Sequence, residues 1–229
     1  MTGGSDIPED PGRLEGYREK LVRRKQEWAR DGRLLSAAEE APRPPQGRLP
    51  PGQRKVENWP VLDLGVQPDI PRDKWIFTVD GLVENPLSWT WEDYMAQPQV
   101  SLVSDIHCVT GWSRFDNCWT GVHVAHLLDM CRPEKDARHC IFYSSDGYTT
   151  NVRIDRFADA DVLLAHSWEG ALLTREHGAP VRVVIPKWYF WKSAKWVRRI
   201  EFAAGDDPGF WEDRGYHNDG DPWKEERYS

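Results

Sequence analysis

Alternating apolar and polar side chains predict a strand over residues 100–108, and the alternation stops at Gly111, where a turn is expected. Successive strand residues point to opposite faces, so Cys108 shares the apolar face of Ile106 while His107 points the other way. Cys108 is therefore expected at the end of a buried strand, beside a loop. A thiol in that place can fill the core, bind a metal or act as a nucleophile.

The chain from residue 56 onward consists mainly of short extended runs bounded by turn residues. A strand and then a short helix are expected between residues 88 and 96. A second helix, with an apolar stripe, is expected after Thr120 as its N-cap, and a brief helical turn is expected after Asp155 as its cap. Short helices among strands, without regular βαβ alternation, predict an α+β fold with mixed β-sheets. Further strands are expected at 75–83, 138–144, 148–153, 161–168, 180–186 and 195–203.

Three regions follow from this pattern. Residues 1–55 are expected to be an extension: Tyr17, Leu21 and Val22 fall on one stripe of a helix, and a Pro-rich strap follows at residues 41–52. Residues 56–205 form the predicted domain. Residues 206–229, acidic and aromatic, are expected to pack on it as an irregular tail.

Composition narrows the classes of function. The 229 residues have a formal net charge of −7, which argues against nucleic-acid or membrane-surface binding. No run approaches the roughly 20 apolar residues of a membrane span, and four Cys do not make a disulfide framework in so long a chain. The first residues lack the apolar core of a signal peptide, so a cytoplasmic location is expected.

A second stretch changes the interpretation of Cys108. From Arg182 to Arg199 there are six basic residues and no acidic one, although the protein is acidic overall. Lys192, Ser193 and Lys195 lie in an aromatic loop, where side-chain charge and main-chain N–H groups can together hold an anion. A solvated charged face is the alternative, but such a face does not require the Trp, Tyr and Phe residues that crowd this loop. A thiolate, an anion cradle and aromatic side chains suit a phosphorylated, ring-bearing cofactor that carries a soft metal.

Two other kinds of site are less well supported. Cys and His residues are frequent between residues 107 and 140, as in zinc sites, but no pair has the Cys-x₂₋₄-Cys spacing. A cysteine nucleophile would need a base, and His107 points away from Cys108 on a strand. A cofactor-binding carrier or subunit without catalysis stays open.

Three blocks of the sequence resemble the sulfite oxidase family, whose members contain the oxidoreductase molybdopterin-binding domain. Residues 106–113 are similar to the family's molybdenum-ligating cysteine loop, and residues 119–128 to the tryptophan-glycine and double-leucine pattern after it. Residues 178–186 and 192–196 are similar to its pterin-phosphate signature. The resemblance covers about residues 56–204, in the family's order, and fits the bacterial single-domain group best.

The resemblance implies a Mo-molybdopterin cofactor, with Cys108 as the metal ligand and the catalytic residue. It implies phosphate contacts from Arg182, Ser193 and Lys195. The remaining cofactor-binding positions that it implies are Asn58, Val61, Leu62, Tyr143, Ser145, His177 and Ala194. Residues 1–50 are expected to be dispensable for cofactor binding.

The implied activity is two-electron oxygen-atom transfer on a small molecule of the sulfite, S-oxide or N-oxide class. The chain has Gly111-Trp112-Ser113 where true sulfite oxidases have arginines after the cysteine, so the resemblance does not single out sulfite. A small-molecule substrate and an unidentified redox partner are expected, without nucleic acid, a membrane span or a haem domain in this chain. The alternatives are a non-catalytic molybdopterin-binding subunit or carrier and a zinc-binding protein.

Overall fold

The computed structural model describes residues 11–31 and 47–229. Half of the predicted Pro-rich strap, residues 41–46, lies outside them. The helices of the described residues are α1 (Pro11–Asp31), α2 (Trp91–Ala96), α3 (Val124–Cys131) and α4 (Ile154–Phe157). The strands there are β1 (Arg54–Lys55), β2 (Ile76–Gly81), β3 (Leu87–Thr90), β4 (Gln99–His107), β5 (Trp112–His123), β6 (His139–Ser144), β7 (Thr149–Arg153), β8 (Leu163–Trp168), β9 (Ala171–Leu172), β10 (Arg182–Val184) and β11 (Val197–Ala203).

The strands form two sheets in the described part of the chain. The first has the order β1-β5-β8-β10, with β4 beside β5 and β9 beside β8, and the second has the order β3-β2-β11-β6-β7. β1 with β5 and β2 with β11 are parallel, whereas the other pairs are antiparallel. The predicted α+β fold with mixed sheets is confirmed.

Most predicted strands lie where expected, but the helix capped by Thr120 was wrong. Thr120 belongs to β5 and pairs with Ser101 of β4, their hydroxyl oxygens 2.9 Å apart. Gly121 follows because a Cβ there would lie 2.0 Å from the carbonyl oxygen of Leu164, so only glycine lets β8 approach. The helix begins at Val124, capped by the side chain of His123.

The predicted cap at Asp155 was also misplaced. Asp155 lies inside α4, whose N-cap is Arg153, and the Arg153 Nε donates to the Asp155 carboxylate at 3.0 Å. The carboxylate therefore lies in the first helical turn, where negative charge is favourable, instead of at the cap.

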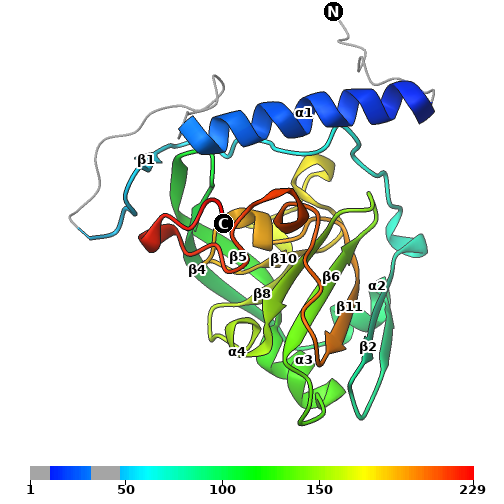
Figure 1. Ribbon diagram of the computed structural model, residues 1–229. Helices are drawn as coiled ribbons and strands as arrows, with labels where there is room; N and C mark the ends of the chain where they lie inside the picture. Colours follow the sequence, from blue (N-terminus) through cyan, green and yellow to red (C-terminus); the bar gives the residue numbers. More distant parts are fainter. Residues whose placement is uncertain (1–10, 32–46) are drawn as a thin grey trace, which may run out of the picture.

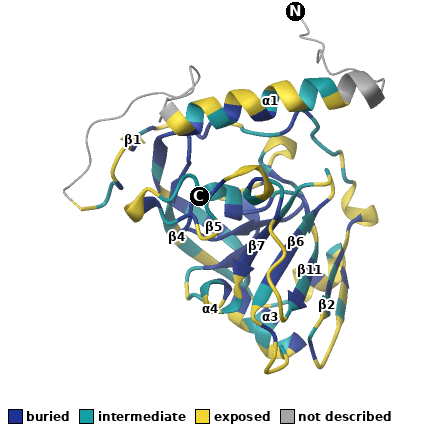
Figure 2. Cartoon of the chain, in the orientation of Figure 1, coloured by how far each residue is buried: buried dark blue, intermediate teal, exposed yellow. Residues whose placement is uncertain are grey.

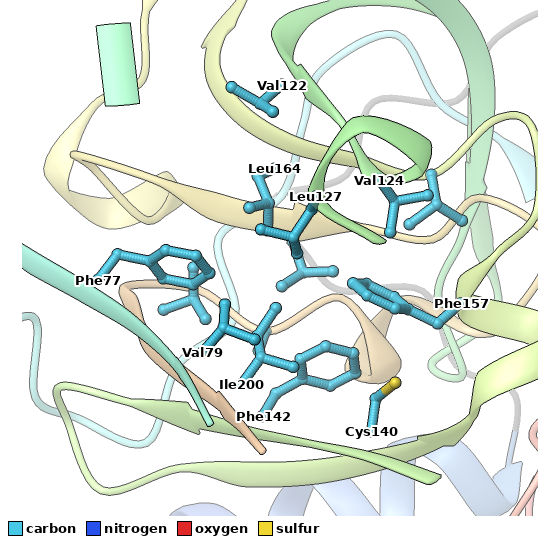
Figure 3. Packing of buried hydrophobic residues seen from close by; sticks show 14 of the residues in the cluster. Phe77, Val79, Val122, Val124, Leu127, Cys140, Phe142, Phe157, Leu164 and Ile200 are labelled. Atoms are coloured by element: carbon cyan, nitrogen blue, oxygen red, sulfur yellow. The ribbon is translucent and has the colours of Figure 1, made fainter. Parts of the chain in front are cut away.

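The main core lies between the two sheets (Figure 3). Phe77 of β2, Phe142 of β6 and Ile200 of β11 meet Leu164 of β8 from the other sheet, with Leu127 of α3 among them; all are buried. Burying such side chains contributes about 1.5–3 kcal/mol each. The two sheets are therefore held together mainly by apolar packing.

The first sheet also has an apolar second face. Val183 of β10 packs into the main core, whereas its neighbour Val184 packs into a second cluster, as the alternation of strand side chains requires. That second cluster includes Val22 and Ala29 of α1 and the buried Trp211 of the C-terminal tail. Helix α1 runs across one end of the molecule (Figure 1), and its residues range from buried to exposed around the axis (Figure 2).

Candidate active site

A cavity with about 860 Å³ of empty space, its mouth included, lies within this second cluster. The cavity is lined by residues from α1, the segment before β2, the β4–β5 turn with the start of β5, the β6–β7 turn, the segment 177–196 and the C-terminal tail. They are Lys25, Trp59, Pro60, Leu62, Asp63, Leu64, Cys108, Val109, Thr110, Trp112, Asp146, Tyr148, His177, Arg182, Phe190, Trp191, Ser193, Lys195, Trp196, Trp211 and Tyr216.

Cys108 is the first residue of the tight turn between β4 and β5. The Cys108 amide donates to the carbonyl of Trp112 at 2.8 Å, and the Gly111 amide donates to the carbonyl of Cys108 at 3.0 Å. Gly111 has φ 95°, which glycine adopts without strain. The Cys108 Sγ lies 3.1 Å from the Thr110 Oγ1, so the turn holds the thiol in one place at the cavity wall.

The Cys108 thiol is held in its protonated form. Burial raises the pKa of this thiol, and the hydrogen bonds from Thr110 and the charge of Arg227 oppose the increase only in part. A bound metal ion reverses that balance, because a coordinating thiol loses its proton.

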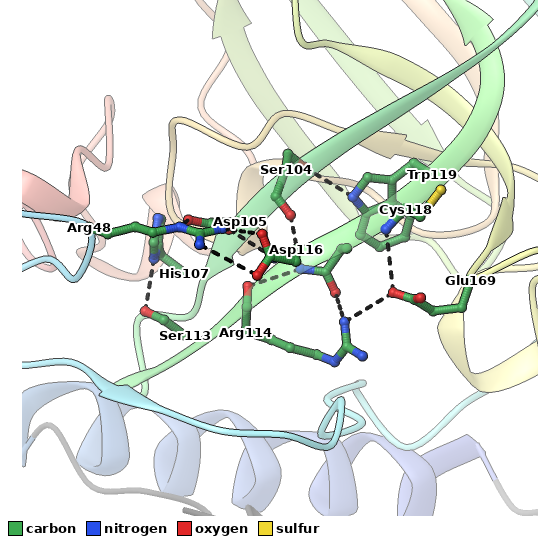
Figure 4. Close-up of polar contacts among 11 residues, drawn as sticks. Arg48, Ser104, Asp105, His107, Ser113, Arg114, Asp116, Cys118, Trp119 and Glu169 are labelled. Carbon is green, nitrogen blue, oxygen red and sulfur yellow. Dashed lines mark hydrogen bonds and ion pairs between the residues drawn. The ribbon is translucent and has the colours of Figure 1, made fainter. Parts of the chain in front are cut away.

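Polar residues behind the turn fix its main chain. The His107 Nδ1 lies 2.8 Å from the Ser113 Oγ (Figure 4), Ser113 donates to the Gln53 Oε1 at 3.2 Å, and Gln53 donates to the carbonyl of Cys108 at 3.0 Å. Because Ser113 has one hydroxyl proton and gives it to Gln53, His107 must donate from Nδ1. Burial lowers the pKa of His107 to about 4, so the ring is neutral near pH 7. His107 therefore positions the turn and does not activate the thiol.

A buried guanidinium lies in the part of the wall formed by residues 177–196. Arg182 is 2% exposed, and it donates to the carbonyls of His177 at 3.0 Å and Ser193 at 2.9 Å. Its guanidinium carbon lies 4.3 Å from the centre of the Phe190 ring. No carboxylate of the described residues forms an ion pair with it, and burial lowers its pKa to about 9. A buried cation without a counter-ion destabilises the folded state, and an anion bound beside it would offset that cost.

Lys195 and Ser193 join Arg182 at the same wall. The Lys195 Nζ donates to the carbonyl of Glu176 at 2.9 Å, and the Ser193 Oγ accepts from the Ile185 amide at 2.9 Å. Desolvation lowers the pKa of Lys195 to about 7 despite the charge of Asp63. A Cβ at Gly178 would lie 3.0 Å from that of Lys195 and 3.2 Å from that of Arg182, so this glycine lets the two cations approach.

An aromatic wall lies beside these cations. The rings of Trp59 and His177 stack with centroids 3.7 Å apart and an interplanar angle of 3°. Burial, together with the charges of Arg182 and Lys195, lowers the pKa of His177 to about 3, so its ring is neutral. Trp112 also lines the cavity, and its indole N–H has no hydrogen-bond partner within residues 11–31 and 47–229. This buried donor suits a polar ligand in the cavity.

Six of the predicted site residues meet at this cavity, and five do not line it. The six are Cys108, Leu62, His177, Arg182, Ser193 and Lys195. Ala194 packs in the main core, Val61 is 36% exposed, Tyr143 donates to the Glu201 carboxylate at 2.8 Å, and Ser145 donates to the carbonyl of Trp196 at 3.2 Å. Asn58 is half-buried outside the wall. For Asn58, Val61 and Ser145, a residue next in sequence lines the cavity instead, namely Trp59, Leu62 and Asp146.

Lys192, predicted as part of the anion cradle, faces away from the cavity. Its Nζ lies 2.6 Å from the Glu212 Oε1 and donates to the side chain of Asn151 at 2.9 Å. Lys192 closes the 3₁₀ turn Phe190–Lys192, which directs its side chain toward the C-terminal tail. A run of basic residues in the sequence does not predict which of their side chains point toward the cavity and which point away from it.

The sequence pattern also missed several wall residues. Trp211 and Tyr216 come from a tail expected to be irregular, and Lys25 comes from an extension expected to be dispensable. One signal was present: Lys25 lies between Val22 and Ala29 at helical spacing, on the buried stripe of α1. Within the described ranges, no group of three or more His, Cys, Asp or Glu residues could hold a metal ion by itself, and no helix is long and apolar enough to cross a membrane.

Comparison with known proteins gives the following similarities. Residues 64–211 match the family described as "Oxidoreductase molybdopterin binding domain". The "Uncharacterized oxidoreductase YuiH" of Bacillus subtilis (strain 168) is 44% identical over 187 residues, which are 80% of this chain and 93% of that protein.

Longer relatives match part of their length. The "Protein-methionine-sulfoxide reductase catalytic subunit MsrP" of Ralstonia nicotianae is 31% identical over 60% of this chain and 46% of its own length. The "Sulfite oxidase" of Arabidopsis thaliana is 28% identical over 61% of this chain and 44% of its own. Among solved structures, the sulfane dehydrogenase SoxCD of Paracoccus pantotrophus shares the fold, with a TM-score of 0.56 at 23% identity, over 61% of this chain and 40% of that one.

Proposed function

We propose that this chain, which belongs to the oxidoreductase molybdopterin-binding domain family, carries out two-electron oxygen-atom transfer on a small molecule of the sulfite, S-oxide or N-oxide class. It is a molybdenum-cofactor oxidoreductase of the sulfite oxidase type, and its cofactor is Mo-molybdopterin. The observation that carries the proposal is the cavity, whose walls contain a rigid buried thiol, the buried Arg182 and the half-buried Lys195, neither cation having an ion-pair partner among residues 11–31 and 47–229.

The residues around the cavity fit this cofactor. All four cysteines of the chain are described, and Cys108 alone lines the cavity, so its thiol is the one that can bind the metal. Arg182 and Lys195 offer positive charge to the cofactor phosphate, and Ser193 lies between them in sequence. The stacked rings of Trp59 and His177 offer a flat surface to the pterin. When bound, the molybdenum supplies the two-electron change that accompanies movement of one oxygen atom.

The protein's own groups provide charge, orientation and exclusion of water. Cys108 releases its proton on binding the metal, and the turn from Cys108 to Gly111 fixes the sulfur relative to the cavity. Arg182 is held by two carbonyls, so its cation is preorganised before the phosphate arrives. The neutral His177 adds no repulsion between Arg182 and Lys195. Apolar walls limit water beside the reacting atoms.

We propose two further properties of the working enzyme. Electrons would be exchanged with a separate redox partner, because the relative MsrP is named as a catalytic subunit. The protein would act in the cytoplasm, and its free, buried Cys131 and Cys140 suit a reducing compartment. Cell fractionation and capture of a redox protein by cross-linking test these two points.

The central test combines metal analysis with turnover. We expect the purified protein to contain molybdenum and pterin in equal amounts. We expect turnover of sulfite with an oxidised dye, or of an S-oxide or N-oxide with a reduced dye. Protein without molybdenum would contradict the proposal. Molybdenum without turnover on the whole panel would instead favour a non-catalytic carrier.

A further inference from the structure

Lys25 is a buried cation that the family's matched segment does not contain. It lies on α1, outside residues 64–211, and is 9% exposed between the buried Val22 and Ala29. Its side chain lines the cavity. Its ammonium group forms no hydrogen bond or ion pair with any residue in the described ranges 11–31 and 47–229. Buried lysines are rare unless they are paired, so this ammonium group lacks the partner it needs.

The acidic groups near Lys25 are already engaged elsewhere. The Asp63 carboxylate accepts from the Gly65 amide at 2.8 Å and from the Gln67 amide nitrogen at 2.7 Å. Asp146 accepts from the amide of Tyr148 at 3.0 Å. Both carboxylates favour the charged form of Lys25 from a distance without contacting it. Neither carboxylate therefore pairs with the Lys25 ammonium group, which lines the cavity.

Helix α1 is fixed over the cavity by its own contacts, so the position of Lys25 is not accidental. Arg18 donates to the carbonyl of Asp146 at 3.3 Å, and Gln26 donates to the carbonyl of Arg214 at 3.0 Å. Tyr17 packs so closely on Gly65 that a Cβ there would lie 2.6 Å from its ring. The segment that bears Asp63, the 145–148 turn and the tail thus all hold the helix. α1 is a wall of the site.

We propose that Lys25 binds an oxyanion inside the cavity and that α1 is therefore part of the ligand-binding site. The oxyanion is either the phosphate of the cofactor or an oxyanion substrate. This identification of the ligand rests on the proposed function. Lys25 lines the same cavity as Cys108, Arg182 and Lys195, so the thiol and these cations surround one space for a ligand. This proposal is opposed to the expectation that residues 1–50 are dispensable for cofactor binding, and measuring the cofactor content of a chain without those residues decides between the two.

The experiment compares Lys25→Met with Lys20→Met, the same change at an exposed lysine of the same helix. Inorganic phosphate is titrated into each cofactor-free protein. A hydrogen bond to a charged group corresponds to roughly ten- to a hundredfold in affinity, so Lys25→Met should weaken phosphate binding by that factor. Lys20→Met should bind phosphate as the unmodified protein does. Equal affinities for Lys25→Met and the unmodified protein would overturn the proposal.

Thermal unfolding separates this role from a structural one. Removing an unpaired buried charge should raise the melting temperature of the cofactor-free protein, whereas removing a structural contact would lower it. A lower melting temperature for Lys25→Met would therefore also overturn the proposal.

Cofactor content and kinetics then identify the source of the oxyanion. Loss of molybdenum and pterin together from Lys25→Met assigns Lys25 to the phosphate of the cofactor. Full cofactor content with a raised KM and nearly unchanged kcat assigns it to the substrate. The phosphate titration is made on cofactor-free protein. If the unmodified protein contained no molybdenum, the proposed function would be contradicted, but the titration would still test anion binding by Lys25.

Discussion

Arg182 and Lys192 are buried cations of one short segment, but their surroundings differ. Lys192 lies behind the cavity, 2.6 Å from the Glu212 carboxylate, and also donates to Asn151. Arg182 lies at the cavity, where its described partners are carbonyls and aromatic rings. Breaking a buried ion pair destabilises the fold, whereas a buried cation without a counter-ion is stabilised when an anion binds beside it. The cysteines can be compared in the same way, because Cys108 lines the cavity whereas Cys140 is buried in the main core.

The cysteines give the largest expected effect. Cys108→Ser should remove turnover almost completely, because a hydroxyl is a poor ligand for a soft metal, while the melting temperature of the cofactor-free protein should change little. Cys140→Ser should do the reverse: burying a hydroxyl in the apolar core should lower the free energy of unfolding by about 1–3 kcal/mol. Turnover per bound molybdenum and thermal unfolding measure the two effects. Full activity of Cys108→Ser would remove the metal assignment.

The paired cation should show a large effect on stability. Lys192→Met removes the cation beside the buried Glu212 carboxylate and leaves it with hydrogen bonds from Trp191 and Thr150, so the free energy of unfolding should fall by about 3–5 kcal/mol. Lys187→Met is the control, because Lys187 is exposed and its 3.2 Å contact with Asp159 should contribute about 1 kcal/mol or less. Urea unfolding measures both. Unchanged stability with lost cofactor would place Lys192 in the cradle after all.

The unpaired cations should affect the ligand more than the fold. Arg182→Ala and Lys195→Ala each remove a charge-assisted contact, so cofactor retention should weaken roughly ten- to a hundredfold. Molybdenum and pterin should be lost together, with an unchanged circular dichroism spectrum. Lys187→Ala, in the same basic run, should retain both. If Arg182→Ala and Lys195→Ala also kept a full complement of cofactor, neither cation would bind the cofactor phosphate.

Local patterns in the sequence predicted what depends on local structure. Alternation placed Cys108 and His107 on opposite faces, and the hydrogen bond from His107 to Ser113 agrees with that. The basic run predicted that Arg182 and Lys195 converge, which the pairing of the Val183 amide with the carbonyl of Ala194 brings about. These features depend on strand periodicity and on short loops.

What the sequence did not reveal depends on packing between distant segments. Lys25 reaches the cavity because α1 docks on residues more than a hundred positions away, such as Asp146 and Arg214. Trp211 and Tyr216 line the cavity because the tail folds back over it. Thr120 is a strand residue because β4 and β8 pair on both sides of β5. The helical spacing of Val22, Lys25 and Ala29 indicates a buried face of α1, but no periodic pattern in the sequence identifies the distant partner in any of these contacts.

The smallest expected effect is a pH dependence, measured on the stability of the cofactor-free protein and on cofactor retention. The two profiles compare the cavity without its anion and with it. Lys195 has its pKa lowered from 10.5 to about 7 by desolvation, with Asp63 and Asp146 opposing the shift and Arg182 and Lys25 adding to it. Between those pH values the unfolded chain binds the proton that the native cofactor-free protein has released. The stability of the cofactor-free protein should therefore rise with pH from about 7 toward 10.5.

Binding of the cofactor should have the opposite slope, because the phosphate favours the charged form of Lys195 and binding takes up a proton above pH 7. Cofactor retention should fall with rising pH, by at most about tenfold per pH unit for this one group. Lys195→Arg is the matched control, since the higher ordinary pKa of an arginine keeps it charged further into this range, which should flatten the profile. The measurements are thermal unfolding of the cofactor-free protein and the rate of pterin release from the loaded protein, each from pH 6 to 9. Parallel slopes in the two profiles would show that Lys195 does not contact the anion, and would leave Arg182 as the sole cation of that part of the wall.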